Sequence, residues 1–248
     1  LRTSTGHGSP GLEMCSGVTE FLVQAPRWLL LFALVFAPWA YGSTRPWTIQ
    51  ILSLLLSSIS LLWVIECVAR RRRPQLPRAA LVAAGGLLLQ GWWMALNAHS
   101  SFIETSETFL PRTSLLLAPG SVDADASIRM MFLVSGLLGV FLYCCDLFQN
   151  PAWRKRVWVT LAVTGASIAA FGIVQKIGGE PVLALIWEPE KRDVTNNFAA
   201  FRNRNNAGAF LNLVLPLLAG LAFVSFQKRD RPWAKAAWLT GLFIVTAG

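Results

Sequence analysis

Apolar residues in this chain gather in long blocks that short charged segments separate. A helix of about 20 apolar residues crosses the hydrocarbon core of a bilayer, and somewhat shorter blocks can also span it. The pattern predicts seven spans, at Trp28–Gly42, Trp47–Ala69, Ala79–Ala98, Ile128–Phe148, Val157–Ile177, Ala207–Phe226 and Ala236–Gly248. We therefore expect an all-α fold, a polytopic bundle of about seven transmembrane helices. Small residues such as Gly165 and Gly172 predict close helix packing.

The two ends of the chain differ from the rest. Residues 1–20 are rich in Gly, Ser and Thr and are expected to form a disordered tail or tag, with Met14 as a candidate start. The transmembrane domain is expected over 21–248. Its last span, Ala236–Gly248, is too short to cross the bilayer, so we expect an N-terminal part of a longer protein.

Basic residues predict the orientation of the spans, because Lys and Arg in short loops are retained on the cytoplasmic side. Clusters at 70–78, 154–156 and 228–235 alternate with acidic segments. The N-terminus is therefore expected in the cytoplasm, and the segments 43–46, 99–127 and 178–206 outside. Arg45 and Arg112 are exceptions to this pattern. The run of four arginines at 70–73 is interpreted as a topology anchor that touches anionic lipid.

Composition supports a membrane protein over the other classes. Hydrophobic residues make up 54% of the chain, charged residues 14%, and the mean hydropathy is +0.50. The net charge of +9 does not indicate nucleic-acid binding, because the charges sit between spans rather than on one face of a folded domain. Four cysteines, at 15, 67, 144 and 145, lack the spacing of a metal or disulfide site and are expected to be small buried hydrophobes.

Several polar side chains fall toward the outer ends of the predicted spans. Polar groups within a membrane tend to face a cavity or a neighbouring helix. These residues are Gln90, Asn97, Arg129, Gln175, Lys176 and Asn212. The set favours a polar cavity open to the outside, with the alternative that each side chain bonds a neighbouring helix. Glu66 and Asp146, near the inner ends of spans, are expected to snorkel to water.

Arg202 and Arg204 lie directly before an apolar span, on the side where basic residues are disfavoured. We expect Asn205 or Asn206 to cap that helix. A helix N-terminus carries about half a positive charge, and guanidinium groups bind phosphate oxygens in pairs. Arg192 in the same loop could add to the patch. The segment thus predicts a phosphate or pyrophosphate site, and the alternative is contact with lipid phosphate at the interface.

The segment from Phe201 to Gly208, FRNRNNAG, resembles the G-T-F-x-N-x-N signature of the O-antigen ligase and polymerase superfamily of bacterial inner-membrane proteins. Asn203 and Asn205 match its two asparagines, whereas Ala199 and Ala200 stand where many members have Gly-Thr. The stretches APWAYGSTRPW (37–47) and AAFGIVQKIGG (169–179) are also similar to patterns of that family.

The resemblance implies a multi-pass membrane glycosyltransferase. Such enzymes transfer a glycan from undecaprenyl pyrophosphate to lipid A core, another glycan or protein at the periplasmic face, with no metal or other cofactor. Taken with the electrostatic argument above, which gives Arg202, Arg204 and Arg192, the matched Asn203 and Asn205 complete the set of residues expected to bind the substrate. Membrane lipids are expected to surround the protein, as its composition indicates. The family's catalytic His and a further Arg are expected beyond Gly248, so the catalytic residues stay unknown, with His99 a weak substitute for the base.

Two other functions remain open at this point. A transporter or flippase for a lipid-linked anionic glycan would use the same outer cavity, although transporters place polar groups near the bilayer midplane. A non-catalytic membrane scaffold would use the arginines only to bind lipid.

Overall fold

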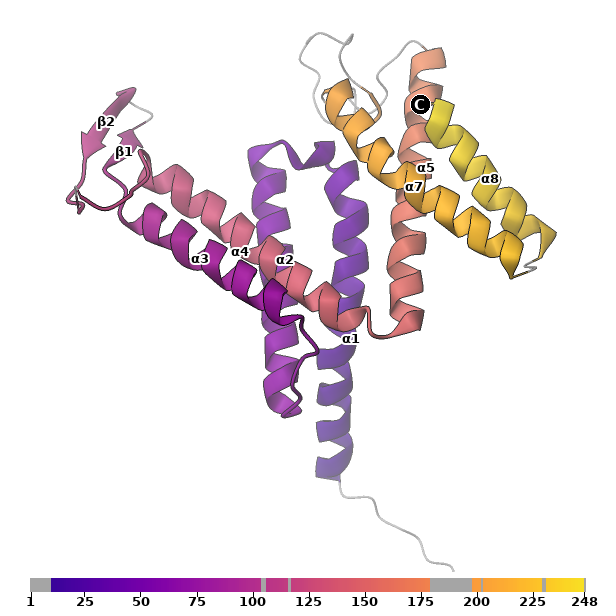
Figure 1. Cartoon of the computed structure of the whole chain (residues 1–248), viewed down its shortest axis with the longest axis horizontal. Coiled ribbons are helices and arrows are strands. Elements are labelled where there is room, and N and C mark those ends of the chain that lie inside the picture. Colours follow the sequence, from indigo (N-terminus) through magenta and orange to yellow (C-terminus); the bar gives the residue numbers. More distant parts are fainter. Residues whose placement is uncertain are drawn as a thin grey trace, which may run out of the picture. The chain divides into compact units, whose positions relative to one another are not determined.

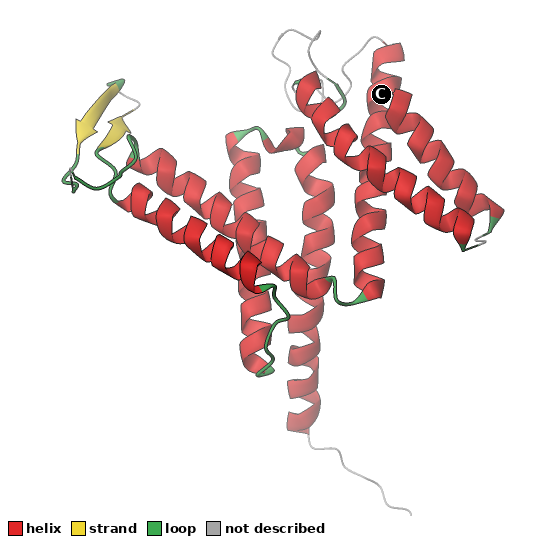
Figure 2. Ribbon diagram, in the orientation of Figure 1, coloured by secondary structure: helices red, strands yellow, loops and turns green. Residues whose placement is uncertain are grey.

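The computed structural model describes residues 10–103, 106–115, 117–178, 198–201, 203–228 and 231–247. Within these ranges the chain forms seven α-helices, a short 3-10 turn and one two-stranded sheet (Figure 1, Figure 2). Six of the helices are long and apolar enough to cross a membrane. The protein is therefore a polytopic helical membrane protein, as the hydrophobic pattern predicts.

The helices run close to the predicted blocks, with some shifts at their ends. Their bounds are α1 Pro10–Trp39, α2 Pro46–Ala69, α3 Arg78–Leu96, α4 Ala124–Leu147, α5 Pro151–Gly178, α7 Arg204–Gln227 and α8 Pro232–Ala247. The candidate span within α1 is Glu20–Trp39. The helix itself begins at Pro10, inside the residues expected to form a tail. Helix α8, with 16 residues, is not among the six candidate spans.

Proline explains several of the early helix starts. Helices α2, α5 and α8 begin at Pro46, Pro151 and Pro232. Proline suits the first helical position, because its fixed φ matches the helix and its missing N–H would have no partner there. An apolar block marks only the part of a helix that crosses lipid, so the prediction missed at least the first turn of α5 and α8, and only Pro46 itself in α2.

The chain divides into two compact units, which are described separately. The first unit contains residues 1–30 and 53–149, and the second contains residues 31–52 and 150–248. Helices α1 and α2 each contribute to both. The region 21–248, expected as one transmembrane domain, thus forms parts of two compact units.

In the first unit, α3 and α4 pack along each other (Figure 1). Strands β1 (Ser100–Ile103) and β2 (Thr108–Pro111) form an antiparallel hairpin between them in the sequence. This hairpin lies in a segment that was expected to be a loop. Gly136 and Gly139 of α4 face α2 so closely that an added Cβ would come within 2.9 Å of Leu56 and 2.3 Å of Ser60. Their lack of a side chain lets the helices approach.

In the second unit, α5, α7 and α8 pack around a small apolar core. Its buried members are Ala162, Ala169, Leu211, Val214, Leu218 and Val245. A Cβ added to Gly165 of α5 would lie 2.5 Å from Val214 of α7. The prediction of close packing at Gly165 is therefore confirmed.

Candidate functional site

The chain enters α7 through a tight turn. The N–H of Phe198 donates to the carbonyl of Phe201 over 3.0 Å, and the N–H of Phe201 donates back over 2.9 Å. Ala199, the first of the two residues between them, has φ 51°. The favoured two-residue hairpin turns have a positive φ at their first residue, and this conformation costs least for glycine. The turn thus holds alanine in a backbone conformation that favours glycine.

Phe201 anchors this turn in the second unit. Its side chain is buried and packs with Ile168, Ala199 and Ala207, and its ring centroid lies 5.8 Å from that of Phe210. A Cβ built on Gly42 would come within 2.5 Å of the Cδ1 atom of Phe201. The short turn between α1 and α2 therefore lies directly against the segment that begins α7.

Two more contacts fix the same region. The Trp39 ring lies 5.6 Å from the Phe171 ring, centroid to centroid. A Cβ on Gly172 would come within 2.3 Å of the Phe198 ring, so the glycine makes room for it. The end of α1, the second half of α5 and the start of α7 thus meet at one place. These are the three sequence stretches on which the family resemblance rests.

The cap of α7 differs from the prediction. The side chain of Asn203 accepts a hydrogen bond from the N–H of Asn205 at 2.8 Å, and the helix begins at Arg204. The prediction that Asn205 or Asn206 caps the helix is wrong: both lie inside its first turn, because the helix starts three residues before the apolar block. Asn203 thereby has a structural role, and Asn205 supplies a backbone donor.

Arg204 is the first residue of α7, and its side chain is exposed, as are those of Asn203 and Asn205. Arg202 and Arg192 lie outside the described residues. Of the five predicted binding residues, the structure thus places three together at one helix N-terminus. Exposed donors at the positive end of a helix can bind an anion.

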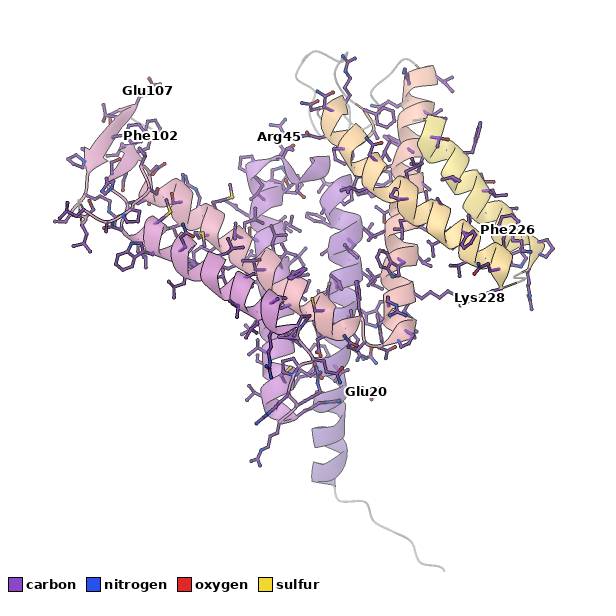
Figure 3. The ribbon with its side chains drawn as sticks, in the orientation of Figure 1. Glu20, Arg45, Phe102, Glu107, Phe226 and Lys228 are labelled. Atoms are coloured by element: carbon purple, nitrogen blue, oxygen red, sulfur yellow. The ribbon has the colours of Figure 1, made fainter. Side chains whose placement is uncertain are left out.

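Arg45 is a second basic residue near this place. It follows Gly42 by three residues, as Arg204 follows Phe201. Since a chain reaches at most about 3.6 Å per residue, the Cα atom of Arg45 lies within about 11 Å of the Gly42 Cα, and the Cα atom of Arg204 lies within about 11 Å of the Phe201 Cα. Figure 3 shows Arg45 at the end of the second unit where α7 begins.

The local backbone orients Arg45. Its N–H donates to the hydroxyl oxygen of the buried Thr48 at 3.1 Å, and that hydroxyl donates to the Arg45 carbonyl at 2.8 Å. Helix α2 begins at the next residue, so two helix N-termini and two arginines share this edge. The segments 40–50 and 198–210 contain no acidic residue. The sequence indicated Arg45 only as a basic residue on the side where the charge pattern disfavours it. It was not predicted to bind a ligand.

The predicted outer cavity stays a prediction. Asn97 does not bond a neighbouring helix, because its amide nitrogen donates to the carbonyls of Leu115, Ala118 and Pro119 in the loop before α4, and its amide oxygen accepts from the N–H of Leu115 at 2.7 Å. It therefore shapes its own loop. Among the other members of the set, Gln175 is half-buried. The remaining four are exposed, and they are Gln90, Arg129, Lys176 and Asn212.

In the first unit, a buried ion pair corrects another expectation. The guanidinium of Arg72 donates two hydrogen bonds to Asp146, at 2.7 and 3.0 Å, and one to Glu66 at 3.3 Å. The Trp63 indole and the N–H of Gln75 also donate to Asp146. The prediction that Glu66 and Asp146 snorkel to water is wrong, since both are buried against this arginine.

Arg72 is therefore more than a lipid-facing anchor. Its hydrogen bond to Asp146 raises the pKa of its guanidinium above the ordinary value, although burial opposes the shift. The side chain also reaches the sulfur of Cys67 at 3.6 Å. Cys67, Cys144 and Cys145 are free and half-buried rather than fully buried, and the side chain of Cys15 is outside the described part.

His99 is held by its own loop. Its Nδ1 lies 2.6 Å from the Ser114 hydroxyl, and its backbone N–H donates to the Ser121 carbonyl. These contacts assign it a structural part in the segment before β1. Within the described ranges, no three His, Cys, Asp or Glu side chains gather as metal ligands would.

Comparisons of the sequence with protein-family models and with curated proteins, and of the fold with solved structures, find no match.

Proposed function

We propose that this chain belongs to a membrane glycosyltransferase of the O-antigen ligase or polymerase type, and that the start of α7 binds the diphosphate of its lipid-linked glycan donor. The observation that carries the proposal is the contact of Phe201 with Gly42. It joins two of the three stretches that resemble this family, and the contacts of Phe171 and Phe198 join the third.

The departure from the family signature also supports the proposal. Ala199 stands where many members have glycine, and its backbone is in the region that glycine favours. The substitution thus keeps a turn of the kind that a glycine would form. The turn positions Phe201 for burial and Asn203 for capping, so Arg204 projects from a fixed helix start.

The electrostatics of the site suit a diphosphate. Each helix N-terminus carries about half a positive charge, and α2 and α7 both begin at this edge. Arg45 and Arg204 add two guanidinium groups, whose paired donors match phosphate oxygens better than an ammonium would. Arg202, adjacent in sequence, is expected to add a third.

Such a site would act on the leaving group. In glycan transfer the bond between the sugar C1 and the diphosphate oxygen breaks, and C1 bonds the acceptor oxygen. The departing diphosphate gains negative charge, which positioned cations stabilise more strongly in the transition state than in the ground state. The acceptor's proton must pass to a base that the described residues do not identify.

Glycan transfer by membranes that contain the full-length protein tests the proposal. We expect Arg204→Lys and Arg202→Lys to lower the rate by about tenfold or more, because lysine keeps the charge but loses the fork of donors. Arg112→Lys, at an exposed arginine directly after β2, is the matched control and should leave the rate unchanged. Wild-type rates in both variants, at normal expression, would refute the diphosphate site.

A further inference from the structure

A cavity of about 940 Å³ lies in the second unit, between the start of α5, the end of α7 and the start of α8. It belongs to the end of these helices opposite to the Phe201 anchor along α7, since α7 begins near Phe201 and ends at Gln227. The proposed diphosphate site does not involve it. Its volume falls within the range of small-molecule binding pockets, about 300 to 1,000 Å³.

Basic side chains line this cavity from all three helix ends. They are Arg154, Lys155, Lys228 and Arg231. No acidic residue is among its described lining residues. Figure 3 shows Lys228 at the end of α7, near Phe226. The four cations of the described lining create a positive potential that favours an anionic ligand.

The walls of the cavity combine aromatic and aliphatic side chains. Trp158, Trp233 and Trp238 contribute to it, and Val163 and Leu221 lie deeper along α5 and α7. Tryptophan is enriched where a membrane meets water, because its ring is apolar and its N–H is polar. Cations close to aromatic rings are the expected surroundings of a phospholipid headgroup above its acyl chains.

A buried hydroxyl at the cavity has no partner. Ser225 lines it and is only 2% exposed, and its Oγ forms no hydrogen bond with the described part of the chain. A buried polar group without a hydrogen bond costs about 1 to 3 kcal/mol, so such groups call for an explanation. A ligand oxygen in the cavity would satisfy it.

From these observations we infer that the cavity binds the phosphate headgroup of an anionic phospholipid. The four cations surround the phosphate, the Ser225 hydroxyl donates to one of the headgroup oxygens, and an acyl chain follows the wall formed by Val163 and Leu221. Basic pockets between transmembrane helices are known to suit such headgroups. The site is distinct from general attraction of lipid to surface charge, because the cations line a cavity, and the Ser225 hydroxyl at that cavity has no hydrogen-bond partner in the described part of the chain.

Affinity for phosphatidylglycerol, measured on the full chain in neutral detergent micelles, tests the inference. We expect tighter binding of phosphatidylglycerol than of phosphatidylcholine. Each cation is worth about a fivefold factor near a lipid surface, so Lys228→Gln/Arg231→Gln should weaken binding about 25-fold. Arg70→Gln/Arg73→Gln removes the same charge from exposed positions of the first unit and is the control, expected to change the affinity less than twofold.

Two further measurements test what the Ser225 hydroxyl and the acyl chain each contribute to lipid affinity. Ser225→Ala should weaken binding of phosphatidylglycerol several-fold, while the lipid-free protein becomes no less stable, because the hydroxyl has no partner to lose. Inorganic phosphate at 10-fold excess should not compete, since the acyl chain contributes to binding. Equal losses in both double variants, unchanged affinity in Ser225→Ala, or displacement by phosphate alone would each overturn the lipid site.

Discussion

The Phe201 ring lies so close to Gly42 that a Cβ added to the glycine would come within 2.5 Å of the ring. Gly42 has φ 59°, in the left-handed region, inside the 3-10 turn Tyr41–Ser43. Two independent constraints therefore select glycine here: the backbone conformation and the space that Phe201 occupies. This contact holds the turn between α1 and α2 against the start of α7.

Gly42→Ala tests that contact. The left-handed backbone costs about 1 to 2 kcal/mol for a residue with a Cβ, and overpacking costs about 1 to 3 kcal/mol more. We expect the variant to lose at least about 2 kcal/mol of unfolding free energy in mixed micelles. Gly220→Ala is the control, because no atom lies within 4 Å of the added Cβ in α7. Equal stability of the two variants would contradict the packing described.

Substitutions at Asn203 distinguish its role as the N-cap of α7 from a role in ligand binding. Replacing the N-cap with alanine should cost about 0.5 to 2 kcal/mol and increase hydrogen exchange in the first turn of α7. Asn203→Asp should keep the cap, because a carboxylate accepts the same bond, yet it should weaken binding of a diphosphate by adding negative charge. Asn205→Ala should change the exchange little. Similar exchange in Asn203→Ala and wild type would show that another group caps the helix.

The ion pair of Arg72 and Asp146 is expected to stabilise the first unit. Removing one member of a buried pair costs about 3 to 5 kcal/mol, but the Arg72 side chain is 37% exposed, so we expect about 1 to 3 kcal/mol for Asp146→Asn. A double-mutant cycle with Arg72→Gln measures the coupling. Arg73→Gln, an exposed neighbour, is the control. Additive effects of the two substitutions would show that the pair contributes nothing.

The orientation in the membrane is a separate prediction. A reporter that is active only outside the cytoplasm should be active when fused within 109–125 and inactive within 229–235, because the basic clusters at 70–78, 154–156 and 228–235 favour the cytoplasm. The reverse pattern would move the start of α7 to the cytoplasmic face. It would also exclude a periplasmic diphosphate site.

The spans could be predicted from the sequence because lipid imposes one physical requirement, a long apolar block, on each of them. The helix ends could not be predicted as well. The start of α7 is set by Asn203, but three nearby asparagines are chemically equivalent as caps, and only the backbone shows which one accepts a bond. In the same way, Pro46 and Pro151 extend their helices beyond the apolar blocks.

The hydrophobic pattern could not predict the long-range contacts. That pattern shows which residues meet lipid, but not which pairs meet each other, so neither Gly42 against Phe201 nor Arg72 against Asp146 could be predicted from it. Glu66 and Asp146 were expected to reach water because they lie near span ends. Arg72, from the connection after α2, reaches back and satisfies them instead.

Binding of undecaprenyl diphosphate to the purified full-length protein, compared with undecaprenyl monophosphate, measures the central claim most directly. We predict tighter binding of the diphosphate in the wild-type protein, and a loss of about tenfold in both Arg204→Lys and Arg45→Lys, with Arg112→Lys unchanged. Equal affinity for the two lipids, or wild-type binding in Arg204→Lys, would contradict the account.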